Sequence, residues 1–201
     1  MSIRSVFAAL AALVVVAPVV LRAQDAEADF ALARRQFVAG QARAASQTVL
    51  ISSLAVRQQV GRCRSQDVGT RLMDAESQLE KLSAALKAGT VTSVKSLDQS
   101  LKEVDRVLAQ HHVQLAIEKM VRPRADDIPV VAHDIDRAAF HFERSVTLDG
   151  QKLAADQATA LSDARALVKQ IETTSAIPKE ATLVVAALEK MINASAVVGG
   201  H

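Results

Sequence analysis

The stretch "SVKSLDQSLKEVDRVLAQHHVQLAIEKMVRP", residues 93–123, decides the fold class of this 201-residue chain. Its large apolar residues recur in steps of three, four and seven, which is the spacing of one face of an α-helix. These residues are Val94, Leu97, Leu101, Val104, Leu108 and Leu115. Ser93 stands where an N-cap belongs, and Pro123 stands where a helix must end. The stretch therefore predicts one long amphipathic helix.

The same pattern continues on both sides of this helix. Ala, Leu, Gln, Glu, Lys and Arg dominate the chain, and no segment alternates apolar and polar residues in the way a strand does. Because short loops place successive helices side by side and antiparallel, we predict an all-α fold, an antiparallel helical bundle of five to six helices. Besides the helix above, helices are expected over about 25–59, 68–86, 129–146, 153–171 and 178–191.

Capping residues set the expected ends of these helices. Ser65 or Asp67 caps the second helix, and Gly89 stands where a C-terminal glycine belongs. Asp127 caps the fourth helix, and Pro129 is tolerated in its first turn. In the first helix, Gly40 and the patch "SQTVLISS" weaken the helical pattern, which favours a kink or break near residues 46–53.

Two weak internal similarities suggest a duplicated hairpin. A shift of 89 positions aligns apolar residues of the second and fifth helices, and "EVDRVLAQ" at 103–110 resembles "DIDRAAFH" at 134–141. Amphipathic helices of similar composition match easily, so a bundle without a repeat stays the alternative. The aligned pairs include Leu72 with Leu161, Ala75 with Ala164, and Leu79 with Val168.

Residues 1–23 have the three-part pattern of a secretory signal peptide. Arg4 gives a positive start, Val6–Val20 is apolar, and Ala23 offers a small residue for cleavage. The alternative is a membrane anchor, but a spanning helix needs about 20 apolar residues, and Pro18 interrupts this run. The alanine-rich leader looks bacterial. We therefore expect a periplasmic or secreted protein with no stable membrane span after cleavage.

The remainder, residues 24–201, is expected to form a single helical-bundle domain. Its 178 residues are enough to bury a core. The segment "RPRADDIP" holds two prolines and a charge cluster, so residues 122–128 are the candidate sub-boundary.

Composition narrows the range of partners. Cleavage after Ala23 removes Arg4 and Arg22 and no acid, which leaves 22 basic and 22 acidic residues. Such a balance argues against nucleic-acid binding, which rests on a basic surface. The chain has no Trp or Tyr, so platforms for stacking bases or sugars are nearly absent. The expected partner is another protein of unknown identity, with self-association as a further option.

No pattern indicates an enzyme or a bound cofactor. The sequence contains no Gly-rich phosphate loop, no GxSxG, no HExxH and no CxxCH. Cys63 is the one cysteine, so no internal disulfide forms. Its neighbours Arg62 and Arg64 would favour a reactive thiolate, whereas the preferred interpretation is an inert thiol half covered by the bundle.

The histidines give the one hypothesis of a chemical site. His111 falls on the apolar stripe, and His112 lies two turns after Asp105. If residues 122–128 fold two helices into a hairpin, His112 and His133 lie at similar heights. Imidazoles together with a carboxylate suit zinc, copper or nickel. The candidate metal ligands are His111, His112, His133 and Asp136, with Asp105 as an alternative carboxylate.

Two functional hypotheses follow from the sequence. The first is an exported, non-enzymatic helical bundle that acts in the cell envelope as a protein–protein interaction or structural module. The alternative is a bundle that binds a small ligand or a divalent metal through the histidines of the third and fourth helices. A lipid-binding role is disfavoured because no strongly basic amphipathic helix is present.

Overall fold

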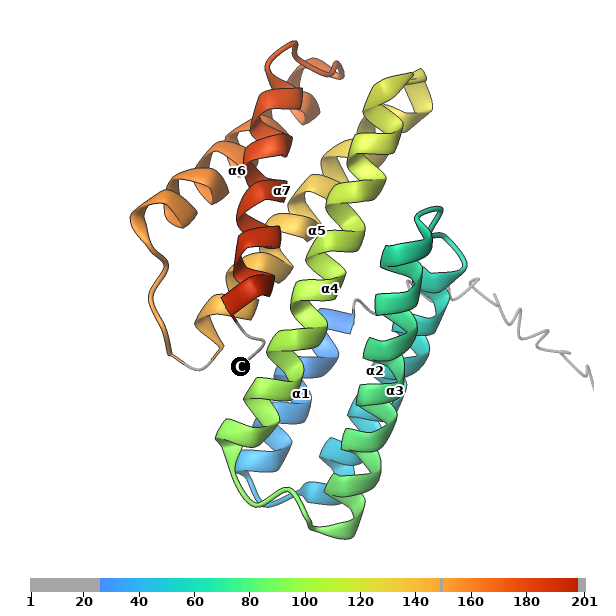
Figure 1. Cartoon of the computed structure of the whole chain (residues 1–201), viewed down its shortest axis with the longest axis vertical. Coiled ribbons are helices and arrows are strands. Elements are labelled where there is room, and N and C mark those ends of the chain that lie inside the picture. The colour runs from blue at the N-terminus through green and yellow to red at the C-terminus, as the bar shows by residue number, and fades with distance from the viewer. Residues whose placement is uncertain (1–25, 149, 199–201) are drawn as a thin grey trace, which may run out of the picture.

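The computed structural model describes residues 26–148 and 150–198, and within them it contains seven α-helices, one 3₁₀ turn and no strand. The all-α bundle is thus confirmed, but the count exceeds five to six. Figure 1 shows the helices packed side by side, with α4 running through the middle. The helices are α1 (Ala26–Val38), α2 (Ala42–Val60), α3 (Gln66–Ala88), α4 (Val94–Val121), α5 (Ile128–Thr147), α6 (Ala155–Thr174) and α7 (Ala181–Val198), with η1 (Ala125–Asp127) before α5.

The additional helix arises because the segment expected as one long helix divides into α1 and α2. The break lies at residues 39–41, where Gly40 has a φ of +76°, a conformation that glycine adopts at little cost. The break expected at residues 46–53 is wrong. The patch lies within the continuous helix α2, where two of its hydroxyls bond to carbonyl oxygens of the same helix: Ser52 Oγ donates to Thr48 O (3.1 Å) and Ser53 Oγ to Leu50 O (2.8 Å).

Most of the expected caps are confirmed. The Ser65 hydroxyl accepts a bond from the Val68 N–H, and Gly89 ends α3 in the left-handed conformation. The Ser93 hydroxyl accepts a bond from the third residue of α4. Asp127 differs from the prediction. It precedes α5, but its carboxylate accepts from the Arg124 N–H (3.1 Å) and so caps η1 instead.

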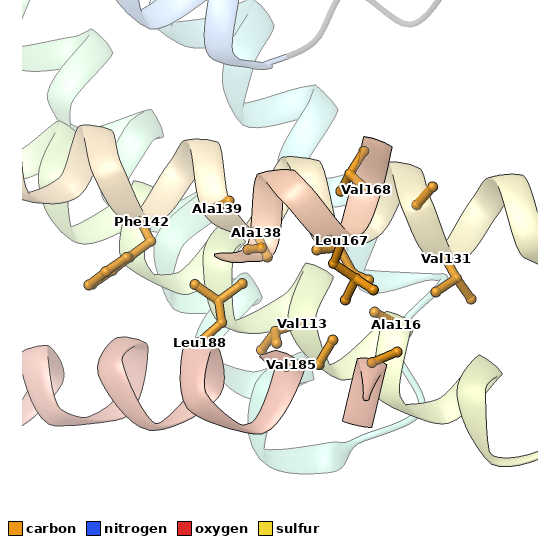
Figure 2. Packing of buried hydrophobic residues seen from close by; sticks show 14 of the residues in the cluster. Val113, Ala116, Val131, Ala138, Ala139, Phe142, Leu167, Val168, Val185 and Leu188 are labelled. Atoms are coloured by element: carbon orange, nitrogen blue, oxygen red, sulfur yellow. The ribbon is translucent and has the colours of Figure 1, made fainter. Parts of the chain in front are cut away.

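The buried apolar side chains form two clusters that share α4. The first cluster joins α1, α2 and α3 to the first half of α4, up to Leu108. The second begins at Ala109 and joins the rest of α4 to α5, α6 and α7, as Figure 2 shows for Val113, Phe142 and Leu188. The change between clusters therefore falls inside a helix, not at residues 122–128. Whether residues 24–201 behave as a single domain stays a prediction.

The positions aligned by the 89-residue shift are buried in both helices. Leu72, Ala75 and Leu79 of α3 lie in the first cluster. Their counterparts Leu161, Ala164 and Val168 of α6 lie in the second. Any two amphipathic helices would bury such stripes, so duplication stays a hypothesis.

The predicted signal peptide, residues 1–23, lies outside the described residues. Of the helices that the structure describes, none has both the length and the apolar character needed to cross a bilayer.

Candidate functional site

A layer of buried polar side chains lies where α4 and α5 pack together, at the boundary between the two apolar clusters. A buried ionisable group is costly unless a partner bonds to it, so such a layer is the first place to look for a function. Each member is less than one tenth exposed. The members are Asp105, His111 and His112 of α4 and Asp134, Arg137 and His141 of α5.

The layer is built from two reciprocal His–Asp pairs. His141 Nδ1 lies 2.9 Å from Asp105 Oδ1, and His112 Nδ1 lies 3.0 Å from Asp134 Oδ1. On each helix the aspartate precedes the histidine by seven residues, which is two turns. Since the helices run antiparallel, each aspartate meets the histidine of the other helix. An ionised carboxylate only accepts hydrogen bonds, so Nδ1 is the donor in both pairs.

The two paired imidazoles also contact each other. The rings of His112 and His141 stack with centroids 5.8 Å apart and planes 6° apart. His111 lies against His112 at 5.3 Å, and His133 approaches its edge at 6.4 Å. His112 is therefore the centre of a group of four imidazoles.

Arg144 makes the two pairs unequal. Its guanidinium bonds to both oxygens of Asp105, with Nε 2.7 Å from Oδ2, and it lies over the rings of Phe30 and Phe140. In the other pair, the second oxygen of Asp134 is buried without a hydrogen-bond partner. The Asp105 pair is thus neutralised by a cation, whereas His112 is the one described residue that bonds to Asp134.

Burial keeps the imidazoles of the layer neutral. It lowers the pKa of His141 to about 4 and that of His111 to about 3, although the Asp105 and Asp134 carboxylates respectively act in the opposite direction. Burial also lowers the pKa of His112, although the hydrogen bond that its ring donates to Asp134 acts in the opposite direction. At neutral pH these rings are uncharged, so they are suited to hydrogen bonding or metal ligation and are poor proton donors.

The four predicted metal ligands are divided between the interior and the surface. His111 is buried, with Nε2 3.4 Å from Gln59 Oε1 and with Nδ1 unpartnered, and His112 is bonded to Asp134. His133 and Asp136 are exposed and line a hollow against α6. The described part of the chain holds no group of three or more His, Cys, Asp or Glu side chains placed to bind a metal ion. Metal binding by these residues stays a prediction.

Sequence reasoning missed the pairing of Asp105 with His141 and the roles of Asp134 and Arg144. One signal was present, since an aspartate followed seven residues later by a histidine occurs at 105–112 and again at 134–141. A repeat of this spacing on two antiparallel neighbours predicts reciprocal pairs.

Cys63 has the properties of an inert thiol. It is half-buried, and its Sγ donates to Ser65 O at 3.2 Å. Burial raises the pKa of the thiol, which is opposite to the effect suggested by Arg62 and Arg64. The thiol is therefore protonated and a weak nucleophile at neutral pH.

No family model, curated protein or solved structure matches this chain, so the functional argument rests on its own residues.

Proposed function

We propose that this protein is an exported, non-enzymatic helical bundle that acts in the cell envelope as a protein–protein interaction and structural module. The observation that carries the proposal is the inward orientation of the His–Asp layer. Its imidazoles and carboxylates bond across α4 and α5, and the hollow between α5 and α6 is lined by other side chains. Such an arrangement fixes the register of two helices and presents no reactive group to a substrate.

The outer face of α2 supports the interaction role. Leu50, Ile51 and Leu54 are 46%, 53% and 48% exposed and share one side of the helix. Adjacent large apolar side chains on a surface are typical of a face that another protein covers. The partner is therefore expected to present an apolar helix or groove to this face, and a second copy of the chain satisfies the same requirement.

A photo-crosslinking amino acid at position 51 tests this assignment in cells that produce the protein. We expect a discrete crosslinked product, either a dimer or an adduct with one other protein. The matched control places the crosslinker at Leu183 of α7, which is 75% exposed and should give no discrete product. Equal labelling at both positions would contradict the proposal.

Self-association is distinguished by sedimentation of the purified protein. If a second copy covers α2, Leu50→Gln together with Leu54→Gln should convert dimer to monomer, and Leu183→Gln should not. A wild-type protein that is monomeric at all accessible concentrations and gives no crosslink at position 51 would refute the interaction role of this face.

Small-ligand or metal binding is the second candidate, because of the hollow between α5 and α6. It has a volume of about 530 Å³, and His133, Asp136 and Glu172 line it together with apolar residues. Two carboxylates beside apolar side chains suit a small organic cation such as an amine. A divalent metal would require His133, Asp136 and Glu172 to lie closer together than the structure places them. The ring of His133 also lies 6.4 Å from the ring of the buried His112.

Thermal unfolding followed by far-UV circular dichroism tests this candidate, with zinc, copper or nickel added to metal-free protein. A ligand of the native state at one hundred times its dissociation constant adds about 2.7 kcal/mol of stability. We expect the increase in midpoint to be lost in His133→Ala with Asp136→Ala and kept in the control Asp163→Ala, which changes an exposed carboxylate of α6. No increase with any of the three ions would exclude the metal form of the hypothesis.

A further inference from the structure

A second hollow, of about 690 Å³, lies where the end of α4 meets the loop between α2 and α3. Basic side chains from three segments surround it. Two come from the α2–α3 loop, two from the end of α4 and one from the segment before η1. They are Arg62 and Arg64, Lys119 and Arg122, and Arg124.

The charge of this basic groove is not balanced locally. Only two acidic residues line it, Glu118 and Asp127, so five positive groups face two negative ones, a net charge of +3. The Asp127 carboxylate already accepts hydrogen bonds from Lys119 Nζ (3.3 Å) and from the Arg124 N–H. The predicted exported chain has equal numbers of basic and acidic residues, so this excess is a local property of the fold.

The arginines of the groove are available to a ligand. Arg64 and Arg122 are exposed and form no ion pair within the described residues. Arg62 is exposed, and its side chain donates to the Gln59 amide oxygen at 3.2 Å. Three guanidinium groups with free donors can therefore turn toward one hollow, and this geometry suits the bidentate binding of phosphoryl oxygens.

Helix stability explains only part of this arrangement. A basic residue near a helix C-terminus offsets the partial negative charge of that end, and this accounts for Lys119 and Arg122 on α4 taken alone. It also accounts for Arg62 and Arg64 after α2. It does not account for bringing both sets around one hollow, because like charges repel. A bound anion would remove that repulsion.

We propose that the basic groove binds a multivalent phosphate-type anion. The source is either a free inorganic phosphate or the headgroup of an acidic phospholipid, since both present the same phosphoryl oxygens. No aromatic side chain lines the groove, so it offers no platform for a nucleobase. The proposal is independent of the α2 face and of the His–Asp layer.

Isothermal titration of the purified protein with inorganic pyrophosphate, at constant ionic strength, is the first test. Arg64→Gln together with Arg122→Gln should weaken binding by about tenfold or more, because two charge-assisted donors are lost. The matched control is Lys81→Gln with Lys87→Gln, which removes two exposed charges from α3. This control should bind as the wild type does.

The source of the anion is decided by sedimentation with vesicles of phosphatidylglycerol or of phosphatidylcholine. Binding to the acidic vesicles without affinity for pyrophosphate identifies a headgroup, and the reverse identifies a free anion. Thermal unfolding followed by circular dichroism shows whether the Arg64/Arg122 variant is folded. Without anion, its unfolding midpoint should equal or exceed that of the wild type, so weaker binding would not be due to unfolding. Failure to bind either probe, or equal weakening in both double variants, would overturn the proposal.

Discussion

The two His–Asp pairs between α4 and α5 share one spacing and one hydrogen bond but differ in what surrounds the carboxylate. Asp105 is bonded by His141 and by two nitrogens of the Arg144 guanidinium, Nε and Nη2. Asp134 is bonded by His112, and its second oxygen is buried without a partner. The two pairs have the same His–Asp motif, and they differ in whether a cation such as Arg144 also bonds to the carboxylate. We infer that this cation decides how strongly the stability of the folded state depends on each aspartate.

Asp105→Ala is expected to have the largest effect on this comparison. It removes the buried carboxylate to which Nε and Nη2 of Arg144, a side chain only 11% exposed, are bonded, and breaking a buried ion pair in this way costs about 3–5 kcal/mol. Urea unfolding followed by circular dichroism measures the loss. The control is Asp98→Ala, whose partner Arg34 is 37% exposed, so the loss should be about 1 kcal/mol or less. Similar losses in both variants would contradict the role given to Arg144.

Asp134→Ala should destabilise the protein less than Asp105→Ala. It removes the acceptor for His112 Nδ1–H and leaves a neutral donor unsatisfied, which costs about 1–3 kcal/mol. The same unfolding measurement applies, and the difference between the two variants is the quantity of interest. A loss for Asp134→Ala as large as that for Asp105→Ala would show that the pairs are equivalent in spite of Arg144.

Stability should also fall as the solution is acidified from pH 7 toward pH 5. The pKa of His141 is lowered to about 4 and that of His111 to about 3, so below the ordinary value of about 6.5 the unfolded chain takes up protons that the folded chain does not. Each such histidine contributes a slope of at most about 1.4 kcal/mol per pH unit. Unfolding free energies at several pH values measure it, and a flat profile over this range would contradict the burial of neutral rings.

His111→Leu should have the smallest effect at neutral pH, a change of less than about 1 kcal/mol. His111 has one long bond, to Gln59, and a buried nitrogen without a partner, so replacing it with an apolar side chain of similar size loses little. The variant should, however, reduce the slope of the unfolding free energy against pH between pH 7 and pH 5 by the contribution of one histidine. A large loss at pH 7 would show that His111 bonds to a group in solution that the structure does not display.

Much of the fold could be predicted from the sequence because it follows from local rules. The stripe of α4, the caps at Ser65, Ser93 and Gly89, and the closeness of His112 to His133 all follow from spacing along one helix or across one hairpin. Gly40 was identified as a weak point, but the break was predicted at residues 46–53 because helical composition continues past Gly40, and the conformation of that single residue decides the turn.

The candidate site was harder to predict because it depends on rotation about the helix axes. His133 lies level with His112 along the α4–α5 hairpin, as predicted. The side chains of His133 and Asp136, however, point outward to the hollow beside α6. Arg144 and Phe30, which complete the surroundings of Asp105, lie on α5 and α1, and no spacing in the sequence relates them to α4. The basic groove likewise depends on tertiary packing, which brings the loop between α2 and α3 beside the end of α4 and the segment before η1.

The sharing of α4 by both apolar clusters has a consequence for proteolysis. Residues 122–126 are exposed, and a protease that cuts there would separate the chain after α4. The C-terminal fragment would lose from its own covalent chain Val113 and Ala116, which belong to the second cluster, and the N-terminal fragment would expose them. The two fragments would therefore remain associated as a nicked complex, and pieces produced separately should reassemble when mixed.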